Sequence, residues 1–318
     1  MRTAAPLLIF ALIVVVGYFV VSHRYSGFRS QQSKEDRVRA SELSADIELL
    51  IPLNKPLAEP GPMDWLATHT EKKQTFAQYT RSGPVRPRGA RDTIYVQPLG
   101  DFSEKERKIV ELTTAFLTSY FSCPVRLNDA LPSSTIPADK RRLLSAMGQE
   151  QVLSGYVLND VLKPRLPDDG AAIIALTSMD LWPGEGWNFV FGQASLKERV
   201  GVWSMSRFGD PEASEEAFRL CLLRTLKVAT HETGHMFSLP HCVLYECNMC
   251  GSNHLKETDR HPLALCPECN AKLCWAISAN PVKRYRSLEQ FSRAHGLVAE
   301  ADRYQKFIKA IDAAKQDK

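Results

Sequence analysis

The chain has 318 residues, of which 44% are hydrophobic and 24% are charged, the proportions of an ordinary globular protein, so most of it should fold. The formal net charge of +4 is small and is spread along the sequence, which argues against nucleic acid as a partner.

Residues 3–22 form an uncharged and mostly apolar segment, TAAPLLIFALIVVVGYFVVS. About 20 such residues can span the roughly 30 Å core of a bilayer. The segment is longer than the roughly 7–15 apolar residues of a signal peptide, and Val20-Val21-Ser22 is a poor cleavage site. We therefore expect a single-pass membrane anchor in residues 1–23, with a cleaved signal peptide as the alternative.

The signals that indicate on which side of the membrane the C-terminal part lies oppose one another. Five basic residues follow the apolar segment, which would leave the C-terminal part in the cytoplasm: Arg24, Arg29, Lys34, Arg37 and Arg39. A short N-terminal tail before an anchor, however, often stays inside and sends the rest across. Thiolate metal ligands persist best in a reducing compartment, and this favours the cytoplasmic side of a membrane-anchored protein.

Residues 24–90 should form a tether and N-terminal extension, because a charged stretch over residues 34–50 is followed by Pro-rich turns. A metal-binding domain should then occupy residues 91–315. The pattern predicts strands near 93–96, 125–127, 171–177, 187–196 and 200–205. It also predicts four helices: one that begins at the capping box Ser103-x-x-Glu106, one over about 139–162, one from about 211 to the histidines, and one over about 288–311. This alternation indicates an α/β (α+β) fold with a mixed sheet and backing helices.

The segment Thr230-His231-Glu232-Thr233-Gly234-His235 closes the long helix. Residues four apart lie on one helical face, so both imidazoles can bind one Zn²⁺, while Glu232 is offset and suited to hydrogen-bond a water. His241 follows Leu239-Pro240, where the helix should stop and the chain can return a third imidazole. Three histidines leave a fourth position open, which is the geometry of a catalytic zinc that lowers the pKa of bound water to about 7.

Six of the eight cysteines fall between residues 242 and 274, which indicates metal chemistry rather than a disulfide framework. Two pairs have the spacing of a closed tetrahedral thiolate site with a structural role: Cys242 with Cys247, and Cys266 with Cys269. Cys250 and Cys274 can compete as ligands, and disulfides or free thiols are the alternative interpretation.

The pattern H-E-x-x-H-x5-H-C-x4-C-x-M, followed by C-x-x-C, resembles the archaemetzincin family of metzincin zinc metallopeptidases. The resemblance spans about residues 90–290. It is close over residues 230–273 and includes the segment WNFVFGQASL at residues 187–196.

The resemblance implies a metzincin-like twisted sheet, an active-site helix and a smaller C-terminal subdomain with a four-cysteine zinc site. It implies two zinc ions per chain: a catalytic zinc on His231, His235 and His241, and a structural zinc on Cys242, Cys247, Cys266 and Cys269. It also implies Glu232 as general base and Met249 as the Met-turn residue beneath the metal. The candidate strand for pairing with an extended substrate comprises Trp187, Asn188, Phe189, Val190, Phe191 and Gly192.

Ser238 departs from the family pattern, since metzincins usually have Gly three residues after the second histidine. If the turn needs a positive φ, Ser is strained there by roughly 1–3 kcal/mol. The leading hypothesis is therefore a monomeric, membrane-anchored zinc metallopeptidase that acts on peptide or protein substrates through a zinc-activated water. The alternative is a catalytically weak zinc-dependent binding or scaffold protein with the same fold. A nucleic-acid-binding zinc ribbon would leave the histidines and Glu232 unexplained.

Overall fold

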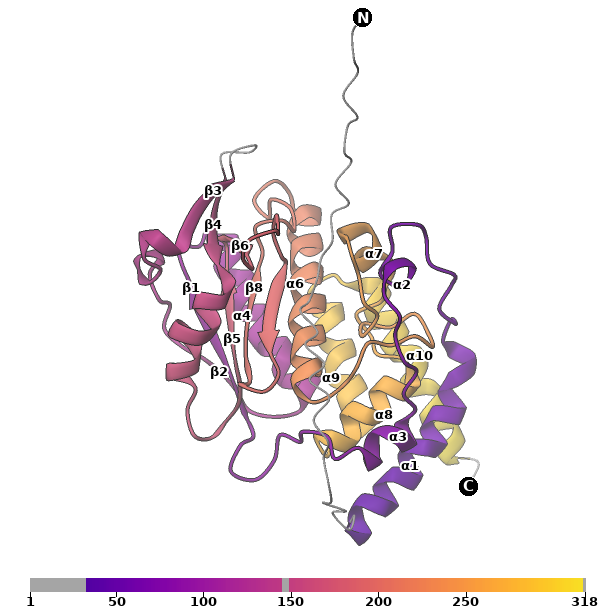
Figure 1. Cartoon of the computed structure of the whole chain (residues 1–318). Coiled ribbons are helices and arrows are strands. Elements are labelled where there is room, and N and C mark those ends of the chain that lie inside the picture. The colour runs from indigo at the N-terminus through magenta and orange to yellow at the C-terminus, as the bar shows by residue number, and fades with distance from the viewer. Residues whose placement is uncertain (1–32, 145–148, 317–318) are drawn as a thin grey trace, which may run out of the picture.

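The structure, a computed structural model that describes residues 33–144 and 149–316, contains a five-stranded mixed sheet, seen in the left half of Figure 1. Its strand order is β2-β1-β5-β8-β7. The bounds are β1 Thr93–Leu99, β2 Val125–Leu127, β5 Gly170–Thr177, β7 Gly192–Ser195 and β8 Val200–Ser204. All neighbouring strands are parallel except β7, which pairs antiparallel with β8 and forms one edge of the sheet. The predicted α/β class with a mixed sheet and backing helices is confirmed.

Alternate residues of the central strands face two separate hydrophobic layers. On one face, Ile94 and Ile174 pack with side chains of α4 (Glu104–Phe121) and α6 (Glu215–Met236). On the other face, Tyr95 and Ile173 pack with side chains of the helical turns Ser154–Tyr156 (α5) and Val157–Leu162, which Lys163–Arg165 follows as a further turn. Strand β5 is buried along its whole length, as its continuous apolar sequence predicts. The predicted capping box is present, because Ser103 accepts from the N–H of Glu106 and the Glu106 side chain accepts from the N–H of Ser103.

The predicted helix over residues 139–162 is wrong in its first half. Strands β3 (Arg141–Leu144) and β4 (Gln149–Leu153) pair antiparallel there, and β6 (Asp180–Trp182) completes a second, three-stranded sheet. The pairing is stabilised across the strands by an ion pair of 2.8 Å between Arg141 and Glu150. The helical turns begin only at Ser154. Three-residue 3₁₀ turns lie at Ile51–Leu53, Ser133–Thr135 and Ala138–Lys140.

The predicted strand over residues 187–196 is shorter than expected, since only Gly192–Ser195 forms β7. Before it, carbonyl groups that a strand would use for pairing are bound by side chains. Arg142 donates to the carbonyls of Trp187 and Asn188, each at 2.9 Å, and Gln151 also donates to Asn188. Residues 187–191 lie outside β7 and are held mainly by the second sheet, through these side chains and through an isolated antiparallel bridge between Val190 and Leu181 of β6.

The C-terminal part is helical: α7 Leu255–Arg260, α8 Pro267–Ala276, α9 Pro281–Ala294 and α10 Val298–Gln316. The single helix predicted over residues 288–311 is in fact two, α9 and α10, which pack against each other. The break lies at Gly296, whose φ of 72° is readily adopted by glycine and ends α9.

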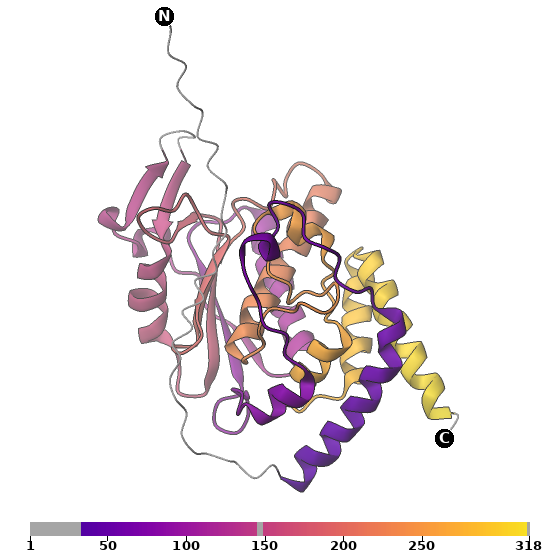
Figure 2. The same ribbon diagram turned by 45° about the vertical axis from the view of Figure 1, so that its right-hand side comes forward.

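Residues 33–90 contain three helices, α1 Lys34–Leu50, α2 Trp65–Thr68 and α3 Phe76–Arg81. Helix α1 packs against α8 and α10, and α3 packs against α8. Figure 2 shows the indigo chain between α1 and α3 passing across the orange segment that follows α6. We call residues 55–90 the strap.

The membrane predictions are corrected. Within residues 33–144 and 149–316, no helix combines the length and the apolar character that crossing a bilayer requires. Residues 3–22, on which the predicted anchor rested, lie outside the described residues. The transmembrane helix, the membrane as a partner and the membrane-anchored location are therefore withdrawn.

Candidate metal and catalytic site

Helix α6 carries the first two histidines on its last turns. It runs from Glu215 to Met236 and is capped by Ser214, whose side chain accepts from the N–H of Ala217. The chain then reverses: the N–H of Ser238 donates to the carbonyl of His235, and the N–H of Leu239 donates to that of Gly234. This tight turn brings His241 back beside the helix.

The three predicted histidines lie together. One ring nitrogen from each of His231, His235 and His241 falls within a group whose members are at most 4.8 Å apart. The Nε2 atoms of His231 and His235 are separated by 3.0 Å. His235 and His241 are buried, whereas His231 is partly exposed.

The other ring nitrogens have acceptors that fix the tautomers. His231 Nδ1 lies 2.7 Å from the carbonyl oxygen of Asn248, and His235 Nδ1 lies 2.6 Å from that of Leu239. Because a carbonyl oxygen only accepts, each Nδ1 must carry the proton and each Nε2 must carry a lone pair. Two lone pairs facing each other at 3.0 Å repel unless a cation lies between them. The site therefore fits a metal ion that accepts imidazole nitrogen, as Zn²⁺ does.

Glu232 is buried next to these histidines, with 4% of its surface exposed. Its Oε2 has no hydrogen-bond partner among the described residues, which is unusual for a buried carboxylate. Burial raises the pKa of the Glu232 carboxyl to about 8. Burial, together with neighbouring His241, lowers the pKa of His231 to about 3. These side chains border a small cavity of about 60 Å³, whose lining includes Trp65, Gly192, His231, Glu232 and His241.

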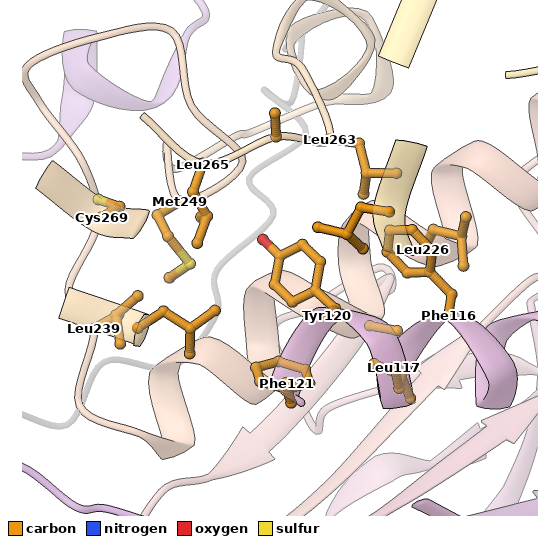
Figure 3. Close-up of a cluster of buried hydrophobic side chains, with 14 of the residues drawn as sticks. Phe116, Leu117, Tyr120, Phe121, Leu226, Leu239, Met249, Leu263, Leu265 and Cys269 are labelled. Atoms are coloured by element: carbon orange, nitrogen blue, oxygen red, sulfur yellow. The ribbon is translucent and has the colours of Figure 1, made fainter. Parts of the chain in front are cut away.

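Met249 lies in a cluster of buried side chains that includes Leu239, Phe121 and Leu265 (Figure 3), and its sulfur lies beside Gly234 of α6. It is fully buried, and its carbonyl accepts from the N–H of Cys242 at 2.8 Å. The turn that contains Met249 therefore holds the residue directly after His241.

The four predicted cysteines form a second group. Their sulfur atoms all lie within 4.8 Å of one another, and all four residues are buried: Cys242, Cys247, Cys266 and Cys269. Cys247 Sγ accepts from the N–H of Cys266 at 3.2 Å, a contact that favours a thiolate. Four thiolates at this spacing suit a tetrahedral Zn²⁺ with no open position.

Two other cysteines lie outside this group of four sulfur atoms. Cys250 Sγ lies 3.3 Å from the carbonyl oxygen of Tyr245, and Cys274 Sγ lies 3.7 Å from Asn270 Oδ1. They are therefore weaker candidates as ligands.

The candidate substrate strand divides into two parts. Gly192 begins the edge strand β7 and borders the cavity beside Glu232. Trp187 and Asn188 lie outside β7, and Phe189, Val190 and Phe191 are buried. The exposed edge therefore begins where the predicted segment ends.

Two further side chains at the site, Glu71 and Trp65, were not predicted from the sequence. Glu71 Oε1 lies 2.7 Å from His241 Nδ1, and the Trp65 ring packs edge-on against the His241 ring at 5.0 Å. Both belong to the strap, and Glu71 is separated from His241 by 170 residues, so no local motif contains them together.

Sequence similarity to known proteins covers most of the chain. The profile of Peptidase family M54 matches residues 157–274. The chain is 34% identical to archaemetzincin-2 of Homo sapiens over 265 residues, which cover 73% of each chain. It is 28% identical to archaemetzincin-1 of Homo sapiens over 266 residues, covering 73% of this chain and 52% of the relative. Among solved structures, an archaemetzincin from Methanopyrus kandleri is 29% identical, with a TM-score of 0.46, covering 60% of this chain and 98% of that chain.

Proposed function

The chain belongs to the archaemetzincin family of zinc metallopeptidases, and from this premise we propose that it hydrolyses peptide bonds at the histidine site. The observation that carries the proposal is the meeting of three imidazoles with a buried carboxylate that has an unused oxygen. Such an arrangement provides a metal and a base beside one small cavity.

In this proposal His231, His235 and His241 hold the catalytic zinc. Bound there, Zn²⁺ would polarise a substrate carbonyl and make water more acidic. The carbonyls of Asn248 and Leu239 keep the first two rings turned with Nε2 toward the metal, which supports their assignment as ligands.

Glu232 acts as the general base. Its Oε2 is free to accept a proton from the attacking water and can then deliver that proton to the nitrogen of the leaving amine. Its offset from the His231–His235 face keeps the carboxylate beside the ligands rather than among them.

The substrate binds in an extended conformation along β7. This strand is the sheet edge next to the cavity, and edge strands offer unpaired N–H and C=O groups to a peptide. The candidate substrate-binding segment is thus reduced to Gly192 and the residues that follow it.

A second zinc on the four cysteines has a structural role. Cys242 directly follows His241, so a metal at the cysteine site would restrain the third catalytic ligand. Residues 91–315 form the metallopeptidase domain in this proposal, with residues 24–90 as its N-terminal extension.

Nothing in the geometry favours the weakly catalytic scaffold. That alternative rested on Ser238, which has a φ of 66° in the left-handed region. Its side chain is used there, since Oγ accepts from the N–H of Val85 at 3.1 Å. The turn thus forms with serine, and this supports the peptidase proposal.

The test is metal content and cleavage of a peptide library by wild type and by Glu232→Gln. We expect two zinc ions in both proteins and a loss of cleavage of at least about 100-fold in the variant, as for removal of a general base. Glu216→Gln, an exposed substitution on the same helix, is the matched control and should keep full activity. A wild type that holds two zinc ions but cleaves nothing would instead support the scaffold.

A further inference from the structure

The strap lies against the loop that presents the third histidine. Its backbone pairs with that loop at two points: the N–H of Leu57 donates to the carbonyl of Leu244 at 3.1 Å, and the N–H of Glu246 donates to that of Lys55 at 2.9 Å. Further along, the Tyr79 hydroxyl donates to the carbonyl of Phe237 at 2.6 Å. The strap is therefore fixed on both sides of residue 241.

Between these anchors, Glu71 reaches the third histidine. Its Oε1 accepts from His241 Nδ1 at 2.7 Å and from the Trp65 indole N–H at 2.9 Å. The His241 side chain is only 2% exposed and that of Glu71 is 19% exposed, so water competes little for this contact.

Trp65 is itself held on several sides. Its backbone N–H donates to Glu257 Oε1 at 2.9 Å, and its ring stacks on His69 with centroids 3.6 Å apart and planes 4° apart. A Cβ on residue 251 would collide with the indole, so Gly251 is needed for this close approach. The donor that orients Glu71 is thus rigidly placed.

We propose that Glu71 is the positioning residue of the third zinc ligand, supplied by the strap to complete the metal site. This inference rests on the proposed function, because it assumes a metal at the three histidines. A carboxylate on Nδ1 fixes the tautomer with Nε2 toward the metal and makes the imidazole a stronger ligand. His231 and His235 use carbonyl oxygens at the same position, whereas His241 uses a charged group.

The experiment compares wild type, Glu71→Ala and Glu71→Gln, with Glu59→Ala as the control. Glu59 is an exposed carboxylate of the same strap. A chelator first removes metal from the histidine site and leaves the cysteine site loaded. Zinc affinity at the histidine site is then measured by competition, and its geometry by the visible spectrum after loading with Co²⁺.

We expect Glu71→Ala to weaken zinc binding at the histidine site by about 10–100-fold and to shift the Co²⁺ spectrum. Glu71→Gln keeps an acceptor oxygen for Nδ1 and should recover most of the affinity. Both variants should keep the zinc of the cysteine site and should be as thermally stable as Glu59→Ala. These two results would show that the variants fold.

Glu71→Ala with wild-type affinity and spectrum would overturn the role of Glu71 and leave the peptidase proposal standing. Equal losses in Glu71→Ala and Glu59→Ala would also overturn it, because they would indicate a general effect of the strap. A wild type whose histidine site takes up no metal would overturn both proposals.

Discussion

The sulfur of Met249 occupies the space that a side chain on residue 234 would need. A Cβ at Gly234 would lie 2.9 Å from Met249 Sδ, closer than such atoms pack, and 3.4 Å from Met249 Cε. Gly234, in the last turn of α6, thus leaves room for the Met249 side chain, although glycine in a helix interior costs about 1 kcal/mol relative to alanine.

Gly234→Ala should therefore destabilise the zinc-loaded protein by about 1 kcal/mol, because overpacking of about 1–3 kcal/mol outweighs the gain in helix propensity. In a Met249→Ala background the sulfur is absent, and Gly234→Ala should then raise the free energy of unfolding by up to about 1 kcal/mol. Urea unfolding of the four proteins measures both effects. An identical effect of Gly234→Ala in the two backgrounds would show that Met249 is not the cause.

Ser238 combines a left-handed backbone with a hydrogen bond to the strap. Ser238→Ala keeps the strained φ and loses the acceptor, so we expect a loss of about 1 kcal/mol in unfolding free energy. Ser238→Gly also loses the acceptor, but it relieves the backbone strain. We therefore expect its free energy of unfolding to stay close to that of wild type.

Ser122 provides the comparison for Ser238, since it has a φ of 49° and is exposed at the end of α4. Ser122→Gly should stabilise by about 0.5–1 kcal/mol, because only strain changes there. If Ser238→Gly and Ser122→Gly raise the free energy of unfolding by the same amount, the hydrogen bond between Ser238 and Val85 contributes nothing to stability.

The cysteine site should support the histidine site through the adjacent residues His241 and Cys242. We expect Cys269→Ser to lose the zinc of the cysteine site and to weaken zinc binding at the histidine site by at least about 10-fold. Cys274→Ser, also buried but outside the sulfur group, should keep two zinc ions. Metal analysis and chelator competition give both results, and unchanged binding at the histidine site in Cys269→Ser would show that the sites are independent.

The edge strand β7 should present alternate backbone groups to substrate. The N–H of Ser204 donates to the carbonyl of Phe191, so the alternation of an antiparallel pair turns the N–H groups of Gly192 and Ala194 away from β8. Ala194→Pro removes one outward donor, and we expect KM for a cleaved peptide to rise roughly 3–10-fold with zinc content unchanged.

Gln193→Pro is the matched control for Ala194→Pro. It removes an N–H that points toward β8, so we expect it to lower the free energy of unfolding and not only the affinity for substrate. Equal effects of both prolines on stability, with KM unchanged in Ala194→Pro, would contradict pairing of substrate with β7.

The central strands, and the histidines that the structure brings together, could be predicted because their signals are local. His231 and His235 are four residues apart on one helix, and the apolar run of β5 needs no distant partner to be recognised. The class of fold follows from the alternation of such elements.

Other features depend on contacts that the local sequence does not contain. Leu and charged residues at 141–153 fit a helix or a hairpin, and only the pairing of β3 with β4 decides between them. The strand at 187–196 is shortened by Arg142, which lies 45 residues away from Trp187. Gly296 was visible as a helix breaker, so the separation of α9 from α10 was open to prediction.

The contact between Glu71 and His241 also bears on the choice of the smallest fragment expected to be active. A recombinant fragment of residues 91–315 would carry all seven candidate metal ligands and would still lack the carboxylate that orients the third histidine. Chimeras that exchange the zinc-binding core with a relative should therefore carry the strap along with it. If Glu71 has the proposed role, the functional unit includes residues 55–90 as well as residues 91–315.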